Sequence, residues 1–95
     1  MSNYDVILTP KTVRQGMARR MKSLRKLMGY TQHELAQRSG VSYASVKRFE
    51  QTGDISLVHL LKLANVLNRL TEFDVLFKND DLAEALQVIA KRAKA

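Results

Sequence analysis

The sequence predicts an all-α fold, namely a helix-turn-helix bundle of about five helices followed by one C-terminal helix. Apolar residues recur at three- and four-residue spacings through most of the chain, which is the periodicity of amphipathic helices. Two short helical patterns, residues 32–39 and 42–51, are separated only by a hinge around Gly40, as in a helix-turn-helix. The 95 residues are enough for one domain with a modest core.

Composition excludes several classes of protein. The chain has no cysteine, hence no disulfide or zinc-thiolate site, which fits a reducing cytoplasm. No apolar run approaches the roughly 18 residues of a membrane span, and no secretory signal begins the chain. His33 and His59 are its only histidines, so we expect no metal and no cofactor. We also expect no enzyme, because no catalytic constellation or phosphate-binding glycine loop is present.

The net charge of +7 is concentrated in the first half of the chain. Residues 11–48 hold ten lysines and arginines against one acid, whereas residues 49–95 hold six against seven. The basic half contains the helix-turn-helix pattern, which favours a nucleic acid as the partner. A solvated basic face without a partner is the alternative.

The first long helix is predicted to begin at Pro10, after an N-terminal arm of residues 1–9. Thr9 can cap the helix and proline fits its first position. The apolar run at 6–8 could be a strand, a packing arm or a frayed terminus. The helix is expected to run to about Met28. Its predicted buried face is Val13, Met17, Met21, Leu24 and Met28.

The two short helices carry their own start and stop signals. Thr31 can cap the first of them, and Glu34 three residues later completes a capping box. Gly40 suits the left-handed backbone of the turn, and Ser42 can cap the second helix. The expected core residues of this stretch are Leu35, Ala36, Val41, Val46 and Phe49.

Helical spacing places Tyr43, Ala44, Lys47 and Arg48 together on the outward face of the second short helix. Arginine and lysine can donate to guanine O6 and N7 in the major groove, and small apolar groups can contact a thymine methyl. Double-stranded RNA hides its major groove from a helix, so this face favours B-form DNA.

These residues resemble the lambda/Cro-type repressor group of helix-turn-helix proteins, the XRE group. The resemblance covers about Val13 to Asn68. It rests on spacings that agree together, namely those of Thr31-Gln32, Leu35-Ala36, Gly40-Val41, Val46 and Glu50. It implies a lambda-repressor-like bundle, a dimer on a pseudo-palindromic operator and transcriptional repression.

The resemblance also implies roles for single residues. In the family, the glutamine at the place of Gln32 contacts a DNA phosphate and braces the recognition helix. An arginine and a glutamate at the places of Arg25 and Glu50 form an ion pair, which we therefore expect here. The expected DNA-binding residues are Gln32, Ser42, Tyr43, Ala44, Ser45, Lys47 and Arg48.

The loop after the recognition helix departs from the family, because Asp54 stands where basic or amide side chains are often found. The Gly53 amide and the Ser56 cap remain as the expected phosphate contacts of this loop. Ser56 starts the next helix, and residues 10–68 complete the DNA-binding domain. The expected apolar face of this helix is Leu57, Leu60, Leu61, Ala64 and Leu67.

Residues 69–95 form a C-terminal helical extension. A fifth helix of two turns, capped by Thr71, is expected to carry Leu70, Phe73, Leu76 and Phe77. After a break at 79–81, a sixth helix is expected to carry Leu82, Leu86, Ile89 and Ala93. Its apolar surface could pack back onto the first helix or across a two-fold axis as a dimerisation element.

The sequence thus predicts a cytoplasmic, nucleoid-associated regulator, most simply a repressor that binds a palindromic operator as a dimer. The alternative is a DNA-binding antitoxin that neutralises a HipA-like kinase toxin and represses its own operon. The Thr9-Pro10 start and the helices after Asn68 favour that alternative, through a resemblance to such antitoxins.

Overall fold

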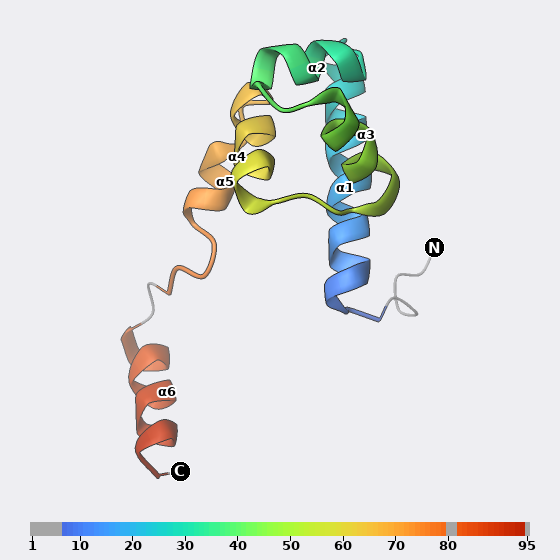
Figure 1. The fold of residues 1–95 in the computed structure, drawn as a ribbon. Coiled ribbons are helices and arrows are strands. Elements are labelled where there is room, and N and C mark those ends of the chain that lie inside the picture. The colour runs from blue at the N-terminus through green and yellow to red at the C-terminus, as the bar shows by residue number, and fades with distance from the viewer. Residues whose placement is uncertain (1–6, 80–81, 95) are drawn as a thin grey trace.

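The computed structural model describes residues 7–79 and 82–94, which form six α-helices and no strand. The helices are α1 (Pro10–Leu27), α2 (Gln32–Ser39), α3 (Tyr43–Thr52), α4 (Leu57–Val66), α5 (Leu70–Asp74) and α6 (Leu82–Lys94). The all-α prediction is therefore confirmed. Figure 1 shows α1 to α5 gathered in one body and α6 lying apart from it at the C-terminal end. The expected arm at residues 1–9 lies mostly outside the described residues.

The core lies where α1, α2, α3 and α4 meet. Its largest fully buried side chains are Phe49, Leu35, Leu63, Leu67 and Val46. Helix α3 packs on both α1 and α2, while α4 packs on α2. Helix α3 is thus held from two sides, and its outward face is left open.

The predicted starts of α1 to α4 are confirmed by hydrogen bonds. The side chain of Thr9 accepts from the Thr12 amide, and Thr31 and Glu34 form the expected capping box. The Ser42 hydroxyl caps α3 and the Ser56 hydroxyl caps α4. Each cap satisfies a backbone N–H that has no partner within its helix, which fixes where the helix begins.

The turn between α2 and α3 has the predicted form. Gly40 has φ 75°, a left-handed conformation that costs residues with a Cβ atom free energy. Val41 follows and is 2% exposed, so it closes the core behind the turn. The two helices therefore meet at an angle set by one glycine and one buried valine.

The predicted buried face of α1 needs correction. Val13 is 42% exposed, whereas Ala18 and Arg25 are buried. Figure 1 shows that the first turns of α1 extend beyond α3, so side chains there have fewer neighbours. The periodicity was right, but it cannot indicate where along a helix the neighbouring helices stop.

The predicted apolar face of α4 is right at three of its five residues, and Leu61 is half-buried. Leu57 is 66% exposed, while Leu63, which was not expected in the core, is fully buried. The true buried set is Leu60, Leu63, Ala64 and Leu67. Leu57 lies in the first turn of α4, one turn before the first buried residue, Leu60.

The fifth helix is shorter than predicted. Helix α5 has five residues and no side-chain cap, and Thr71 lies inside it rather than at its start. Phe77 has φ 64° and is 99% exposed, so the chain leaves the helical path before this residue.

Helix α6 does not pack back onto α1. Leu86 and Ile89 are 55% and 61% exposed, and Figure 1 shows α6 well away from the N-terminal helix. That alternative is therefore wrong for this structure. Within the described ranges, no helix combines the length and the hydropathy needed to cross a membrane.

Candidate nucleic-acid interface

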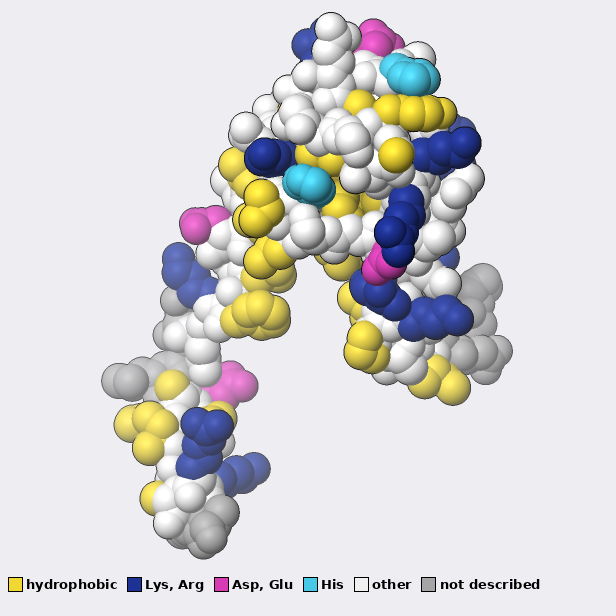
Figure 2. Space-filling model, viewed as in Figure 1, with side chains coloured by type: hydrophobic (Ala, Val, Ile, Leu, Met, Phe, Trp, Pro, Cys, Tyr) yellow, Lys and Arg dark blue, Asp and Glu magenta, His cyan; other side chains and the backbone are white. Residues whose placement is uncertain are grey.

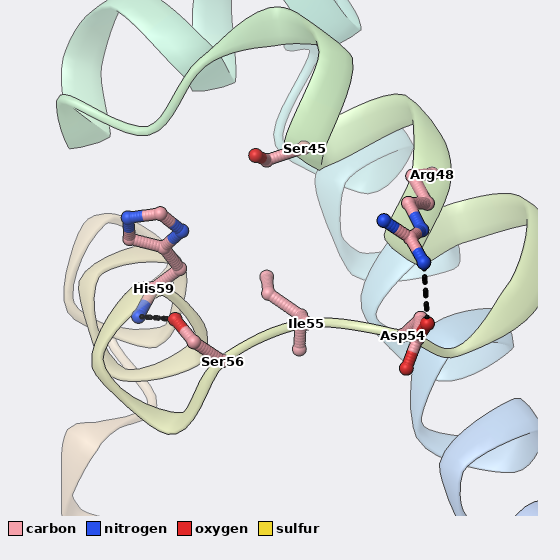
Figure 3. A pocket seen from close by; sticks show the side chains of 6 residues that line it. All are labelled: Ser45, Arg48, Asp54, Ile55, Ser56 and His59. Carbon is pink, nitrogen blue, oxygen red and sulfur yellow. Dashed lines mark hydrogen bonds and ion pairs between the residues drawn. The ribbon is translucent and has the colours of Figure 1, made fainter.

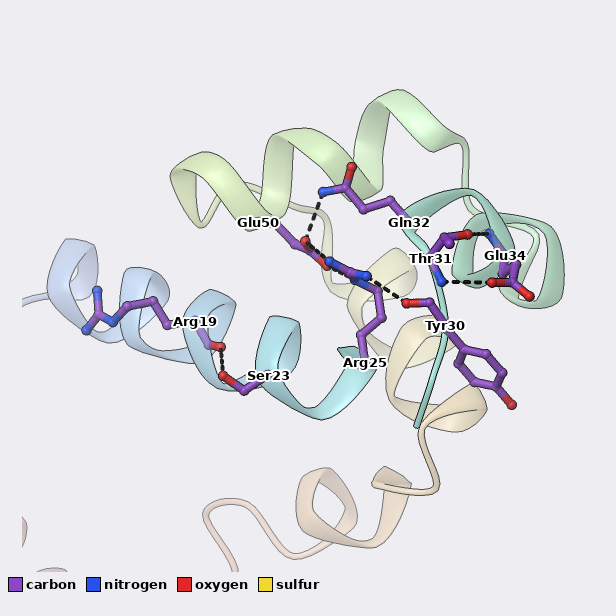
Figure 4. Close-up of polar contacts among 8 residues, drawn as sticks. All are labelled: Arg19, Ser23, Arg25, Tyr30, Thr31, Gln32, Glu34 and Glu50. Atoms are coloured by element: carbon purple, nitrogen blue, oxygen red, sulfur yellow. Dashed lines mark hydrogen bonds and ion pairs between the residues drawn. The ribbon is translucent and has the colours of Figure 1, made fainter. Parts of the chain in front are cut away.

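Glu50 on α3 is the centre of a buried polar cluster that joins three helices (Figure 4). The Arg25 guanidinium donates to it twice, from Nε at 2.7 Å and from Nη2 at 2.9 Å. Its Nη1 also donates to the Tyr30 carbonyl at 2.7 Å. The side chains of Arg25 and Glu50 are only 7% and 3% exposed. The structure thus brings the expected ion pair together.

The charge on Glu50 is stabilised by its partners. Burial raises the pKa of Glu50, but hydrogen bonds from Arg25 and Gln32 outweigh burial and hold the pKa below its ordinary value. The carboxylate is therefore ionised and compensated. An acid so close to the recognition surface costs little attraction for phosphate, because its charge is already paired.

Gln32 stands at the first position of α2 and donates from Nε2 to Glu50 at 2.9 Å. This is the bracing contact that the sequence led us to expect. The side chain is half-buried, and it links the N-terminus of α2 to the middle of the recognition helix. Helices α1, α2 and α3 are thereby fixed to one carboxylate.

The outward face of α3 is open. Ala44, Lys47 and Arg48 are exposed, while Val46 and Phe49 on the opposite side are buried. Figure 2 shows basic side chains following one another along the side of the molecule formed by α3 and α1. Three of the four residues expected on the outward face of α3 are therefore available to a ligand.

Tyr43, the fourth residue expected on this face, is less accessible than expected. Its ring stacks on the ring of His33, with centroids 3.7 Å apart and planes 8° apart. Tyr43 is half-buried and also packs against the core. His33 thus holds the tyrosine at the α2–α3 junction. Nothing in the spacing of the sequence pointed to this pair.

The two serines at the start of α3 bond to one another. The Ser42 hydroxyl accepts from the Ser45 amide at 3.1 Å and donates to the Ser45 hydroxyl at 2.8 Å. Ser42 is exposed and Ser45 is half-buried. Ser45 also lines a hollow between α3 and α4 whose volume is about 350 Å³ (Figure 3). The other residues around the hollow are Arg48, Asp54, Ile55, Ser56 and His59.

Asp54 makes two contacts that sequence reasoning missed. Its Oδ2 accepts from Arg48 Nη2 at 2.8 Å (Figure 3), and its Oδ1 accepts from Arg14 Nη1 at 3.1 Å. The acid that departs from the family pattern thus joins a base of the recognition helix to a base of α1. Arg14 lies 40 residues away in sequence, so only a three-dimensional structure could reveal the contact.

One expected phosphate contact of the same loop is wrong. The Gly53 amide already donates to the Phe49 carbonyl at 2.7 Å, and the residue is buried. It therefore has no free N–H for a ligand. The Ser56 hydroxyl accepts from the His59 amide at 3.1 Å, which leaves its own proton available.

No group of three or more potential metal ligands occurs among residues 7–79 and 82–94. In the same ranges every buried side-chain nitrogen and oxygen has a hydrogen-bond partner. The polar chemistry of this surface therefore lies in its exposed bases, amides and hydroxyls.

The residues of this surface lie within a range that matches a known protein family. A family model described as "Helix-turn-helix" matches residues 21–73, which is more than half of the chain. The matched range contains the Arg25–Glu50 pair and all the expected DNA-binding residues from Gln32 to Arg48. None of the curated proteins matches the chain.

Proposed function

The chain belongs to the Cro/C1-type helix-turn-helix family and is a DNA-binding transcription regulator, and from this premise we propose that it is a sequence-specific repressor. It binds a palindromic operator as a dimer, with α3 of each copy in a major groove. This activity would take place at the nucleoid, in the cytoplasm. Repression follows if the bound dimer occupies the DNA that the transcription machinery needs.

One observation carries the proposal: the open face of α3 sits on a scaffold fixed by buried contacts. Lys47 and Arg48 are exposed on that face, and the Glu50 cluster fixes the helix that bears them. A site that reads base edges must hold its donors in a defined place, because misplaced donors lose their geometry. A site that recognises base edges therefore requires a rigid scaffold behind its open basic face.

The residues then divide into two roles. Lys47 and Arg48 donate to base edges, and Ala44 offers a small apolar contact to a thymine methyl. Tyr43, held by His33, contributes shape at the start of the helix. The phosphate contacts come from groups at the helix N-termini, where backbone amides favour an anion. They are Gln32, Ser42 and Ser45.

The direct test is selection of bound sites from a pool of random DNA duplexes. A dimer with one α3 per half-site is expected to select a palindrome whose half-sites are about 34 Å, or one helical turn, apart. A single unpaired half-site would overturn the dimeric arrangement. Enrichment of no sequence would overturn sequence-specific binding.

Repression needs its own test, since binding alone does not give the sign of regulation. The selected operator is placed upstream of a reporter gene, and the protein is expressed from a separate promoter. Expression of the reporter is expected to fall, and the fall should disappear when the operator is scrambled. Increased expression would make the protein an activator instead.

A second candidate is the antitoxin function, favoured by the C-terminal extension. Leu76, Phe77 and Ile89 are 52%, 99% and 61% exposed, which is much apolar surface for one short segment. Such surface marks a protein partner, either a second copy or a kinase toxin. Co-expression with the product of the neighbouring gene, followed by purification and kinase assay, distinguishes the two. A stoichiometric complex that suppresses kinase activity supports the antitoxin, and a homodimer alone supports the plain repressor.

A further inference from the structure

The backbone of Gly53 is pressed against α1. A Cβ atom at this position would lie 2.9 Å from the carbonyl carbon of Arg14 and 3.0 Å from its oxygen. Gly53 also has φ 81°, which turns the chain sharply after α3. The next residue, Asp54, is therefore delivered to the side of α1 from which Arg14 projects.

A second set of contacts fixes Asp54 to α3. The Thr52 hydroxyl donates to the Arg48 carbonyl at 2.7 Å, and the Asp54 amide donates to the Thr52 hydroxyl at 3.1 Å. The Asp54 carboxylate is thus aimed by its own backbone, and the Arg48 side chain folds toward it. The acid lies between two bases on the face that meets DNA.

We propose that Asp54 is a positioning residue for specific recognition: by bridging Arg14 and Arg48 it orients the Arg48 guanidinium and reduces its attraction to any phosphate. The proposal rests on the proposed function. It adds that the acid in this loop, which lowers total affinity, raises the preference for the operator over other DNA.

The physical basis is a competition for Arg48. The side chains of Arg48 and Asp54 are 70% and 47% exposed, so their ion pair is weak and open to exchange. A phosphate is charged, so the Asp54 carboxylate, which offsets the charge of Arg48, weakens the attraction between them. A guanine edge is neutral and needs N–H donors. Asp54 takes one hydrogen of Nη2, which leaves its second hydrogen and those of Nη1 for O6 and N7. The bridge therefore penalises phosphate binding more than base reading.

The experiment compares the full chain with Asp54→Asn, which removes the charge and keeps the shape. Its matched control is Asp74→Asn, which changes the net charge equally at an exposed position on α5. Binding to the selected operator and to a scrambled duplex is measured over a range of salt concentrations. Circular dichroism and thermal unfolding check that each variant is folded.

Asp54→Asn is expected to tighten binding to the scrambled duplex about fivefold near 0.15 M salt, because one more phosphate is neutralised. The salt slope, which is the slope of log affinity against log salt concentration, should become steeper by about 0.9. Operator binding should gain less, so the ratio of operator to scrambled affinity falls several-fold. Asp74→Asn should leave that ratio unchanged. A purely structural role for Asp54 would lower stability without changing the salt slope.

Repeating the measurement in an Arg48→Ala background shows whether Asp54 acts through Arg48. The ratio should then no longer respond to Asp54→Asn, because the oriented group is gone. If it responds fully, or if Asp54→Asn alone leaves the ratio unchanged, the inference is overturned while the regulator function stands. If the unaltered chain does not distinguish operator from scrambled DNA, the proposed function fails, and the inference with it.

Discussion

In the proposed complex with DNA, base recognition depends most on Arg48. It is exposed on α3, and arginine can donate twice to one guanine. Replacing Arg48 with alanine is expected to cost about 1–3 kcal/mol on the selected operator and to relax preference at one base position. Equilibrium binding to a set of single-base operator variants measures both effects.

The control for this prediction is Lys78→Ala, which removes one positive charge from an exposed residue beyond α5. It should weaken all sequences slightly and equally. If Arg48→Ala behaves in the same way, weakening every sequence equally, then Arg48 contacts phosphate and does not read bases.

Glu50 should matter for stability far more than the exposed acids do. Glu50→Ala leaves the Arg25 guanidinium buried without its partner, a change that typically costs about 3–5 kcal/mol. The matched control is Glu72→Ala, which breaks the Arg69–Glu72 pair at 2.7 Å between side chains that are 49% and 61% exposed. That loss should be about 0–1 kcal/mol. Urea unfolding of both variants gives the comparison, and equal losses would contradict the structural role of Glu50.

Acid should remove part of the stability that Glu50 provides. Its pKa in the folded chain lies below the ordinary value of 4.5, because the hydrogen bonds from Arg25 and Gln32 outweigh burial. The stabilisation is therefore present above about pH 4.5 and is lost as the pH falls through the folded-state pKa. Urea midpoints measured from pH 7 downward should fall more steeply in the unaltered chain than in Glu50→Gln.

Glu34 adds to the same acid sensitivity, since hydrogen bonds to the backbone and side chain of Thr31 also lower its pKa. It is unchanged in Glu50→Gln, so the difference between the two curves reports Glu50 alone. Curves with the same slope below pH 4.5 would show that Glu50 does not titrate differently in the folded and unfolded chains.

At the residue scale, the sequence allowed predictions where local spacing or a family resemblance applied. Arg25 and Glu50 were paired in advance because the family has that pair. The Tyr43–His33 stack and the Asp54 bridge were missed, since each depends on how two elements approach in space. The sequence showed that Asp54 departs from the family pattern, but it did not show that Arg14 and Arg48 are the partners of this acid.

At the scale of elements, caps were the most informative signals. Helices α1 to α4 begin where Thr9, Thr31, Ser42 and Ser56 predicted. Helix α5 begins without a side-chain cap, so its start and length could not be predicted. A helix start with a capping side chain can be predicted from the sequence, because the cap is a local hydrogen bond. The ends of an uncapped helix depend on packing, which local sequence does not show.

The loop at Gly53 gives a test of packing between elements. Alanine at a left-handed position costs about 1–2 kcal/mol from its Cβ atom alone. At Gly53 the new Cβ would also meet the α1 backbone at 2.9 Å, so a further cost of about 1–3 kcal/mol is expected. Gly29→Ala is the matched control, because Gly29 has φ 80° with no atom within 4 Å. Urea unfolding should rank Gly53→Ala clearly below Gly29→Ala, and equal losses would show that the loop can move away from α1.

At the scale of the whole molecule, α6 is separate from the body that binds DNA. The core consists of residues from α1 to α4, the turn at Val41 and the C-cap of α4, and none of residues 83–93 of α6 belongs to it. A chain ending at Lys78 should therefore keep its fold, with a thermal midpoint within a few degrees of the full chain. If α6 is the dimerisation element, the shortened chain should be a monomer by light scattering and should bind the palindromic operator more weakly.

Point variants separate this cause from a general effect of truncation. Ile89→Asp on α6 and Val58→Asp on α4 each place a charge at an apolar position that is 61% or 62% exposed, so neither should disturb the core. A charge buried in an interface without a partner is costly, and only the variant that lies in the dimer contact should produce monomers. We expect Ile89→Asp to do so and Val58→Asp to leave the dimer intact. The opposite result would move the two-fold axis to the α4–α5 side of the body, and the half-site spacing would then be set by the core rather than by the C-terminal helix.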